Sequence, residues 1–372
     1  MASPPERPRT DYGSAGVDAD AVEAGLAGLV RHIRTTWPDG GSGLGAIKGR
    51  SGYFASVVDF GGMGVAICTD GIGTKALIAQ MTGRYGTVGI DCVAMNVNDL
   101  VCVGARPVTL VDYIAVERAE PAMLEALGAG LAEGARLAGV SISGGEIAEM
   151  RDVIKGAVSG KGFDLAGTAV GLVDLDAVNV GAAVRPGDSI VGIASSGVHS
   201  NGLTLARRVF FETAGLTVDD RLDDLGETVG EALLRPTHIY VREALDLLAS
   251  EVPVHALAHI TGDGFLNLTR IEARVGMRLD ALLAPPPVFT VLQRLGGIED
   301  AEMHRVFNMG VGFCVVVPPE HEAGATAILG AHGKVCQRVG TVVDDAEQRV
   351  WIEQAGLVGR PGQGFAREGA TP

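Results

Sequence analysis

Several features are scarce or missing in this sequence of 372 residues, and each absence excludes a class of protein. No apolar run approaches the roughly 18 residues that a membrane span requires. The N-terminal residues MASPPERPRT lack the apolar stretch of a secretory signal. The five cysteines form no CxxC pair and no metal-ligand spacing, which indicates reduced thiols instead of disulfides or a zinc site. We therefore expect a soluble, cytoplasmic protein with no membrane partner.

Positive charge and aromatic side chains are also scarce. The formal net charge is −15, aromatic residues make up 5% of the chain, and no block of Lys or Arg occurs. A nucleic-acid partner is not expected, because affinity for a phosphate backbone comes from clustered cations. An anionic small molecule stays compatible with this charge, since a few local cations, backbone amides and Mg²⁺ can bind phosphate inside an acidic protein.

Glycine, in contrast, is abundant, with 54 residues, many of them at the junctions between apolar runs. Runs rich in β-forming residues and bounded by Gly, Asp or Ser predict strands at 64–70, 108–116, 140–146, 166–173, 188–196 and 311–317. Helical spacing and end signals predict helices at 89–104, 121–139 and 200–215. This interleaving predicts a mixed α/β (α+β) fold.

The length favours two domains, each large enough for a core of its own. The pattern of elements pauses within 173–188, so we divide the chain into domains of residues 11–176 and 177–346. The N-terminal residues 1–10 are rich in Pro and charge, and the end of the segment 347–372 has no apolar periodicity. Both segments are predicted to be mostly mobile.

Acidic residues recur at the ends of the strands predicted in the first half. Asp70 ends one strand, Asp112 follows the start of another, Glu146 and Glu149 follow a Ser-Gly-Gly turn, and Asp99 lies in a predicted helix. Carboxylates gathered at one end of a sheet suit Mg²⁺, which binds a few carboxylates together with substrate phosphates. Each acid taken singly is more commonly a turn former or a helix cap. Together, and beside glycine turns, they favour a metal–nucleotide site.

The segment TDGIGTK (69–75) joins one of these acids to a glycine turn and a lysine. It is not a P-loop, because that pattern places four residues between its first glycine and a Gly-Lys pair. Lys75 could neutralise a transferred phosphoryl group. The alternative is a solvated lysine at a helix start, which five lysines in the whole chain make less attractive.

Three polar glycine turns occur in the second half, in SSGVHSNG (195–202), HITGDGF (259–265) and FNMGVG (307–312). The first joins a strand to a helix, whose N-terminus offers unpaired N–H groups to an anion. His199 could act in acid–base chemistry, or it could belong to a capping network, which is the commoner role of a histidine in such a loop. Three such turns in one domain suggest a shared face, and corners of a glycine-rich sandwich are the alternative for all three.

These motifs, taken together, resemble the phosphoribosylformylglycinamidine cyclo-ligase family of purine biosynthesis, also called aminoimidazole ribonucleotide synthetase. The similar segments are DYGSAGVDADA, TDGIGTK, GIDCVAMNVNDL, GARPVTLVDYIA, GGEIAEM, ASSGVHSNG, RPTHIYV, AHITGDGF and FNMGVG, in order over about residues 11–343. The NDLxxxGAxP pattern is shared with a wider superfamily. TDGIGTK, GGEIAEM and HITGDGF together are typical of the cyclo-ligase.

The resemblance implies two αβ domains with the active site in the cleft between them, and a homodimer that pairs first domains. It implies ATP and Mg²⁺, with K⁺ as a candidate monovalent ion, and formylglycinamidine ribonucleotide as the small-molecule substrate. By motif position, the metal ligands would be Asp70, Asp99 and Glu146, and the catalytic residues His199, Lys75 and Asp99. The ATP-binding residues would be Asp70, Gly71, Gly73, Thr74, Lys75, Asn98 and Glu146. The substrate-binding residues would be Ser196, Gly197, His199, Asn201, Gly262 and Gly264.

Some positions depart from the family's pattern. Asp263 stands where glycine is expected, Ile147 where threonine is usual, and the loop 151–163 differs. The alternatives are another ATP-using enzyme of the superfamily, either a small-molecule kinase or an amide-activating synthetase, and a non-catalytic nucleotide-binding protein. Several carboxylates around a triphosphate argue against a pure binder, because they would repel it in the absence of a metal.

Overall fold

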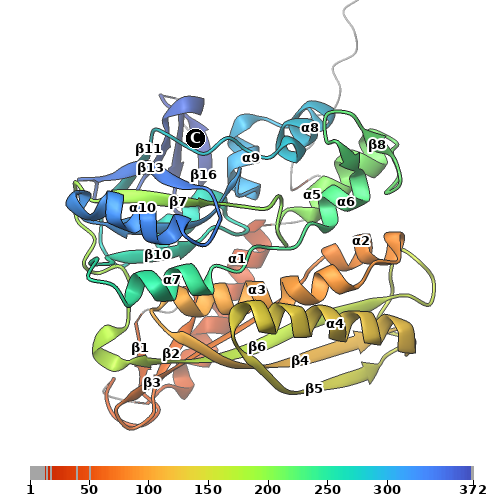
Figure 1. Cartoon of the computed structure of the whole chain (residues 1–372), viewed down its shortest axis with the longest axis horizontal. Helices are drawn as coiled ribbons and strands as arrows, with labels where there is room; N and C mark the ends of the chain where they lie inside the picture. The colour runs from red at the N-terminus through yellow and green to blue at the C-terminus, as the bar shows by residue number, and fades with distance from the viewer. Residues whose placement is uncertain (1–12, 14–15, 17–18, 39–40, 50–51, 370–372) are drawn as a thin grey trace, which may run out of the picture.

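The computed structural model describes residues 13, 16, 19–38, 41–49 and 52–369, which form two α/β domains stacked on each other (Figure 1). The predicted mobile segment 1–10 lies outside the described residues. The first sheet ends at Asp174 and the second begins at Ser189, so the predicted boundary at 176 falls in the connection between the two sheets. In the described part of the chain, no helix has the length and apolarity to cross a bilayer.

The first domain is built on a six-stranded sheet with helices on one face. The strand order is β1 (Ile47–Lys48), β2 (Ser56–Asp59), β3 (Met63–Gly71), β6 (Phe163–Asp174), β4 (Arg106–Val116) and β5 (Ser141–Glu149). The helices are α1 (Ala19–Ile33), α2 (Lys75–Thr82), α3 (Gly86–Cys102) and α4 (Pro121–Ala138). In Figure 1, α3 and α4 lie between this sheet and the second domain.

Helix α3 is the central element of the first domain, and glycines let α4 approach it closely. A Cβ atom on Gly130 of α4 would lie 1.8 Å from the carbonyl oxygen of Gly86, and one on Gly89 would lie 2.5 Å from the amide nitrogen of Leu131. Real Cβ atoms do not approach other atoms so closely, so these contacts require glycine. Most of α3 is buried, which fixes the polar side chains that it carries.

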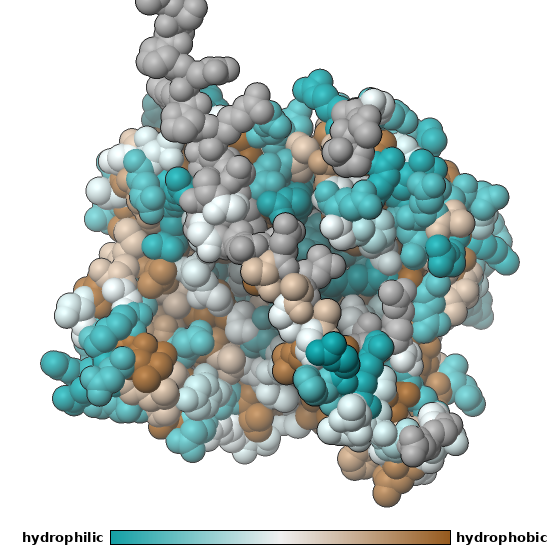
Figure 2. Space-filling view, turned by 180° about the vertical axis from the view of Figure 1, so that it is seen from behind, coloured by the Kyte–Doolittle hydropathy of each residue, from teal (hydrophilic) through white to brown (hydrophobic). Residues whose placement is uncertain are grey.

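The other face of the first sheet has no covering element among the described residues. The pairing register places Ile67, Val111, Tyr113 and Leu172 on this open face, where they are 37%, 43%, 44% and 41% exposed. Seen from behind, hydrophobic side chains reach the surface over the lower half of the molecule, which is the first domain (Figure 2). An apolar sheet face of this kind marks an interaction surface.

The second domain contains an eight-stranded sheet. The strand order is β10 (Ala256–His259), β12 (Val311–Val317), β7 (Ser189–Ala194), β13 (Cys336–Val343), β11 (Gly276–Leu279), β14 (Val350–Ile352), β15 (Leu357–Arg360) and β16 (Gly364–Arg367). Its helices are α5 (Leu203–Arg207), α6 (Val229–Leu234), α7 (Val241–Leu248), α8 (Pro287–Gly296), α9 (Asp300–Val306) and α10 (Glu322–Gly330). A small hairpin pairs β8 (Arg221–Leu222) with β9 (Glu227–Thr228).

The mixed α/β fold is confirmed, but the prediction of a mostly mobile segment 347–372 is wrong for its greater part. Residues 350–367 supply three strands that extend the second sheet, and β14 pairs in parallel with β11. Each strand is only three or four residues long and pairs partly with segments distant in the sequence. Such short runs carry no periodicity that a sequence pattern could detect.

Candidate active site

The carboxyl end of β3 brings two acidic residues of the first domain together. Asp70 lies at the end of β3, two residues after Cys68 on that strand. Asp99 lies on α3, and its Oδ2 atom is 3.8 Å from the Cys68 thiol. Burial and the nearby charge of Asp99 raise the pKa of Asp70 to about 6. A carboxylate whose proton affinity is raised by a neighbouring negative charge favours a bound cation.

The second domain reaches the same place through His259 and the loop before α5. His259 of β10 is fully buried, and its Nδ1 atom lies 2.8 Å from Oδ1 of Asp99. A cavity of about 390 Å³ lies beside these groups, and we call it the acidic cavity. It is lined by residues of both domains, namely Asp70, Gly71, Gly73, Met95, Asp164, Ala166, Ser200 and Asn201.

The glycine turn after β3 shapes one wall of the acidic cavity. Gly73 has a φ of 55°, which side-chain-bearing residues rarely adopt, and a Cβ atom there would come within 4.0 Å of the Ser200 carbonyl oxygen. Thr74 lies next to it, and its hydroxyl is 3.1 Å from that of Thr204. The first two predicted positions of the turn, Gly71 and Gly73, therefore line the cavity, whereas Thr74 bridges the two domains.

Asn201 supplies an unused hydrogen-bond donor at the acidic cavity. Its Nδ2 atom is buried and has no partner in the structure. Leaving a buried donor unpaired costs about 1–3 kcal/mol, so such a group commonly serves a ligand. The residue predicted from the HSNG motif is therefore placed where it can bind one.

Glu146 does not share this place, and the prediction of three carboxylates around one metal ion is wrong within a single chain. It lies on β5, separated from β3 by β4 and β6, which at about 4.8 Å per strand is on the order of 14 Å. In register it aligns with Tyr113 and Gly71, so it projects from the open face, opposite to Asp70. Among the described residues, no three His, Cys, Asp or Glu side chains form a group that could hold a metal ion.

Lys75 lies in the core and does not face the acidic cavity. It is 0% exposed, and its Nζ atom lies 2.9 Å from both Asp91 oxygens and 2.7 Å from the Arg235 carbonyl oxygen. Burial lowers the pKa of Lys75, and Asp91 opposes that shift. Lys75 was predicted to face a phosphoryl group, but in the structure its ammonium group joins α2, α3 and the second domain.

Asn98 is likewise a structural residue instead of an ATP-binding one. It is fully buried, accepts a hydrogen bond from the Tyr240 amide at 2.9 Å and donates one to the His238 carbonyl at 2.8 Å. The next residue of α3, Asp99, instead contacts His259 of the second domain, so adjacent residues of one helix serve different partners.

His199 is 1% exposed and lines neither this cavity nor another described one. The Ser196 amide donates to its Nε2 atom at 3.2 Å, which assigns the imidazole proton to Nδ1, an atom with no partner. Burial, together with His238, His259 and Lys75, lowers the pKa of His199 well below its ordinary value. The ring is therefore a neutral hydrogen-bond donor, and a catalytic role for it stays a prediction.

The other glycine-turn positions are held by the protein's own atoms. The Ser196 hydroxyl donates to the Pro236 carbonyl, and the Gly197 carbonyl accepts from Asn308 at 2.8 Å. A Cβ atom on Gly264 would lie 2.0 Å from the His304 carbonyl oxygen, so this buried glycine is required for packing. These three residues do not line the acidic cavity, and their assignment to the substrate stays a prediction.

Gly262 and Asp263 lie at the rim of the same turn. Gly262 is exposed and approaches the Asn201 side chain, where a Cβ atom would come within 3.3 Å of Oδ1. Asp263 has a φ of −98° and pairs with Arg270, so no left-handed conformation is needed at this departure from the family's pattern.

Some polar residues in and around the site were not predicted: Asp164 and Ser200 line the acidic cavity, His259 contacts Asp99, and Asp91 holds Lys75 in the core. Asp91 and His259 stand within motifs that the sequence analysis quotes, GIDCVAMNVNDL and AHITGDGF. Asp164 has no motif around it, and only its position on β6, beside the end of β3, brings it to the cavity.

Comparison with known proteins shows the relationships of the chain. Models of AIR synthase related proteins match in two parts, the N-terminal domain over residues 52–173 and the C-terminal domain over residues 185–353. Phosphoribosylformylglycinamidine cyclo-ligase of Methanothermobacter thermautotrophicus is 47% identical over 331 residues, which cover 88% of this chain and 94% of that protein. The protein of the same name from Pyrococcus furiosus is 44% identical over 342 residues, with coverages of 90% and 97%.

Solved structures share the fold at lower identity. Hydrogenase maturation protein HypE in complex with ATP matches with a TM-score of 0.57 and 23% identity, over 77% of this chain and 80% of that one. Thiamine-monophosphate kinase from Stenotrophomonas maltophilia matches with a TM-score of 0.59 and 22% identity, over 87% and 95%. These likenesses show the two-domain architecture alone.

Proposed function

The chain belongs to the AIR synthase related family and, within it, to the phosphoribosylformylglycinamidine cyclo-ligases, and from this premise we propose that it closes the imidazole ring of aminoimidazole ribonucleotide with ATP. The substrate is formylglycinamidine ribonucleotide, and the step belongs to purine biosynthesis. The observation that carries the proposal is the acidic cavity, where Asp70 and its glycine turn meet Asn201 of the second domain.

The reaction needs an activated oxygen and a held nucleophile. An amide oxygen leaves poorly, so the formyl oxygen first takes the γ-phosphoryl group of ATP and ADP departs. A nitrogen of the same substrate then attacks the formyl carbon, the carbon–oxygen bond breaks, and inorganic phosphate leaves. Holding both ends of one molecule in reacting geometry favours the ring closure.

The carboxylates of Asp70 and Asp99 fit a divalent cation, because they are hard oxygen donors at one place and repel each other without one. Mg²⁺ bound there would neutralise charge on the nucleotide phosphates. His259 contacts Asp99 through Nδ1 and thereby orients the carboxylate. Whether K⁺ takes part stays a prediction without support from these residues.

Asn201 and the backbone of the glycine turn would orient the substrates. The Asn201 amide offers its free N–H to a phosphate or formyl oxygen at the cavity. Gly71 and Gly73 carry no side chain, so a bound molecule can approach the backbone directly. His199 holds its proton on Nδ1 and would act as a neutral hydrogen-bond donor if the loop moved it toward the substrate.

The homodimer is proposed from the open face of the first sheet. Its apolar side chains include Val111 and Tyr113, and nothing in the described chain covers them. A second copy of the same face is the simplest partner, because an isologous contact buries both patches at once.

A panel of substrates tests the proposed function. Purified protein with Mg-ATP is given formylglycinamidine ribonucleotide, thiamine monophosphate or selenide, and ADP release is measured. The proposal expects release only with the first substrate. Release with either of the others would keep the nucleotide site and replace the reaction.

A further inference from the structure

A second and larger cavity lies between the two domains, on the other side of α3. Its volume is about 700 Å³, and Ile90 of α3 lines it. Met95 is the residue of α3 that lines the acidic cavity, and it is five residues from Ile90, so at about 100° per residue the two side chains project about 140° apart around the helix. The two cavities are therefore separate, and of the predicted site residues only Ser196 lines the second one.

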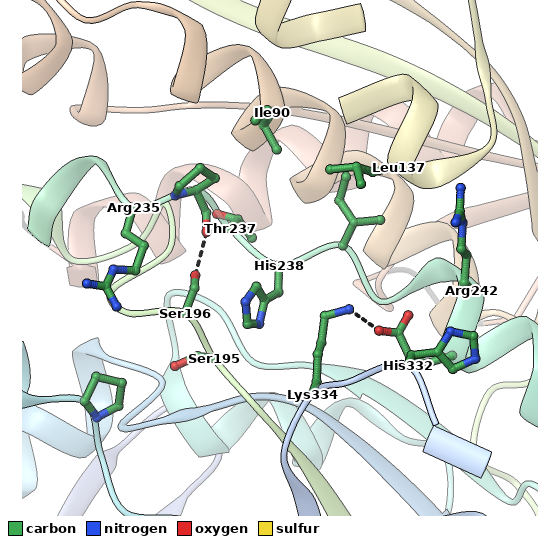
Figure 3. Close-up of a pocket in the computed structure, with 14 residues that line it drawn as sticks. Ile90, Leu137, Ser195, Ser196, Arg235, Thr237, His238, Arg242, His332 and Lys334 are labelled. Atoms are coloured by element: carbon green, nitrogen blue, oxygen red, sulfur yellow. Dashed lines mark hydrogen bonds and ion pairs between the residues drawn. The ribbon is translucent and has the colours of Figure 1, made fainter. Parts of the chain in front are cut away.

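Basic side chains line this second cavity. It is lined by Arg235, His238, Arg242, His332 and Lys334, with the carboxylate of Glu243, and we call it the basic cavity. Figure 3 shows Arg235 and Lys334 on either side of His238. The chain has a net charge of −15, so a group of basic side chains around one cavity contrasts with its overall charge.

The cations are only partly neutralised by the protein. Lys334 pairs with the buried carboxylate of Glu243, and Arg235 pairs with Glu227, which does not line the cavity. Arg242 donates a hydrogen bond to the Arg136 carbonyl oxygen at 3.0 Å, and in the described part of the chain no carboxylate forms an ion pair with it. An arginine held by one carbonyl keeps donors for an anion.

The remainder of the wall is apolar and comes from both domains. Ile90 and Leu137 of the first domain face Pro236, Ile239 and Pro286 of the second. A cavity of several hundred Å³ with apolar walls and a few convergent polar groups has the character of a small-molecule site.

We propose that the basic cavity binds a phosphate monoester of a small molecule that carries a flat apolar group. The phosphate would lie beside Arg242 and Lys334, on one side of His238, and the apolar group against Ile90 and Leu137. This site is independent of ring closure at the acidic cavity. Because the ligand would contact both domains, it would also stabilise their arrangement by mass action.

Calorimetric titration of the full-length protein with phenyl phosphate tests the proposal, with inorganic phosphate and phenol in parallel. Phenyl phosphate contains the phosphate and the flat ring but no ribose or adenine. We expect it to bind more tightly than either fragment. The Arg242→Gln variant, altered at an exposed side chain, should lose affinity roughly ten- to a hundredfold, as expected for a charged hydrogen bond.

Three further variants make the result specific. Arg278→Gln changes an arginine of β11 that pairs with Glu353 outside the cavity, and it should bind phenyl phosphate like the wild type. Asp70→Asn should also keep phenyl phosphate affinity, because it alters the other cavity. The double variant Lys334→Gln/Glu243→Gln removes the buried ion pair as a unit and should weaken binding.

Absence of phenyl phosphate binding to the wild type would overturn the proposal. So would affinity that survives Arg242→Gln, or affinity that is lost in Asp70→Asn. Loss of affinity in Asp70→Asn would place the phosphate in the acidic cavity. None of these three results would bear on the ring-closing reaction.

Discussion

Asp70 and Asp99 are two carboxylates that the fold holds close together in partly buried surroundings. Asp70→Asn and Asp99→Asn each remove one charge and keep the size of the side chain. We expect each variant to lose at least a hundredfold in ADP release, because the cation that screens the nucleotide loses a ligand. Circular dichroism and thermal unfolding check that the variants fold, and Asp263→Asn, exposed at the rim, is the matched control. Near-normal turnover in either variant would remove that residue from the metal site.

The pH dependence of cation binding follows from the pKa of Asp70, which burial and Asp99 raise to about 6. Below that pH the carboxyl group binds a proton that a divalent cation must displace. The apparent Mg²⁺ affinity should therefore fall as the pH is lowered through 6 and level off above about 7. In the metal-free protein, the free energy of unfolding changes with pH in the opposite direction. Between pH about 4 and 6 the native state keeps a proton on Asp70 that the unfolded state has lost, so stability falls as the pH rises through this range.

Titration of Mn²⁺ binding by electron paramagnetic resonance between pH 5 and 8 measures this effect, with Asp70→Asn as the control. The wild type should show the decline at low pH, and the variant should bind weakly with a flatter profile. A flat profile in the wild type would show that Asp70 is not a ligand.

At the residue scale, the sequence predicted which motifs meet but not which way each side chain points. Asp70, Gly71, Gly73 and Asn201 were predicted and line the acidic cavity, and the charge of the predicted Asp99 acts on Asp70. Neighbouring positions in the same motifs, Lys75 and Asn98, turned out to bind the protein itself. A motif specifies the spacing of residues along the chain. The direction in which each side chain points also depends on its contacts with the second domain, which a local sequence pattern does not describe.

Helix α3 links the elements, because its buried polar residues hold the second domain. Asp91 accepts hydrogen bonds from the Thr237 amide at 2.7 Å and hydroxyl at 2.6 Å. Asn98 bonds to the backbone of His238 and Tyr240 in the same segment. Lys75 completes this junction through Asp91. The junction lies between the acidic and basic cavities and fixes the distance between the elements that line them.

Lys75→Met tests the structural role of that ion pair. The substitution leaves the Asp91 charge buried without its counter-ion, and we expect a loss of about 3–5 kcal/mol in the free energy of unfolding. Urea denaturation measures it. Lys155→Met, at a lysine 65% exposed and paired with Glu117, should change stability by less than about 1 kcal/mol. A Lys75→Met protein as stable as the wild type but without turnover would return Lys75 to the phosphoryl group.

At the element scale, helices with many periods were predicted well and short strands poorly. The predicted helices 89–104 and 121–139 correspond to α3 and α4 within three residues at each end. The predicted helix 200–215 is instead α5 followed by a π-helix at Arg208–Thr213. The strands after residue 347 were missed because three or four residues show too few repeats of the two-residue period.

The whole molecule is a stack in which one sheet face stays open. If two chains pair through that face, Val111→Glu should convert a dimer to a monomer, since a charge buried at the contact is unfavourable. Light scattering after size-exclusion chromatography gives the mass. Val335→Glu, at a 64% exposed valine of the second domain, is the control and should stay dimeric. A wild-type monomer, or a dimeric Val111→Glu protein, would place the contact elsewhere.

The most direct test of the proposed reaction measures two products in one assay. ADP and aminoimidazole ribonucleotide are quantified together, over time, with Mg-ATP and formylglycinamidine ribonucleotide. The account predicts equal amounts at every time point, and loss of both products in Asp70→Asn. ADP without the aminoimidazole product, or the product without ADP, would contradict it.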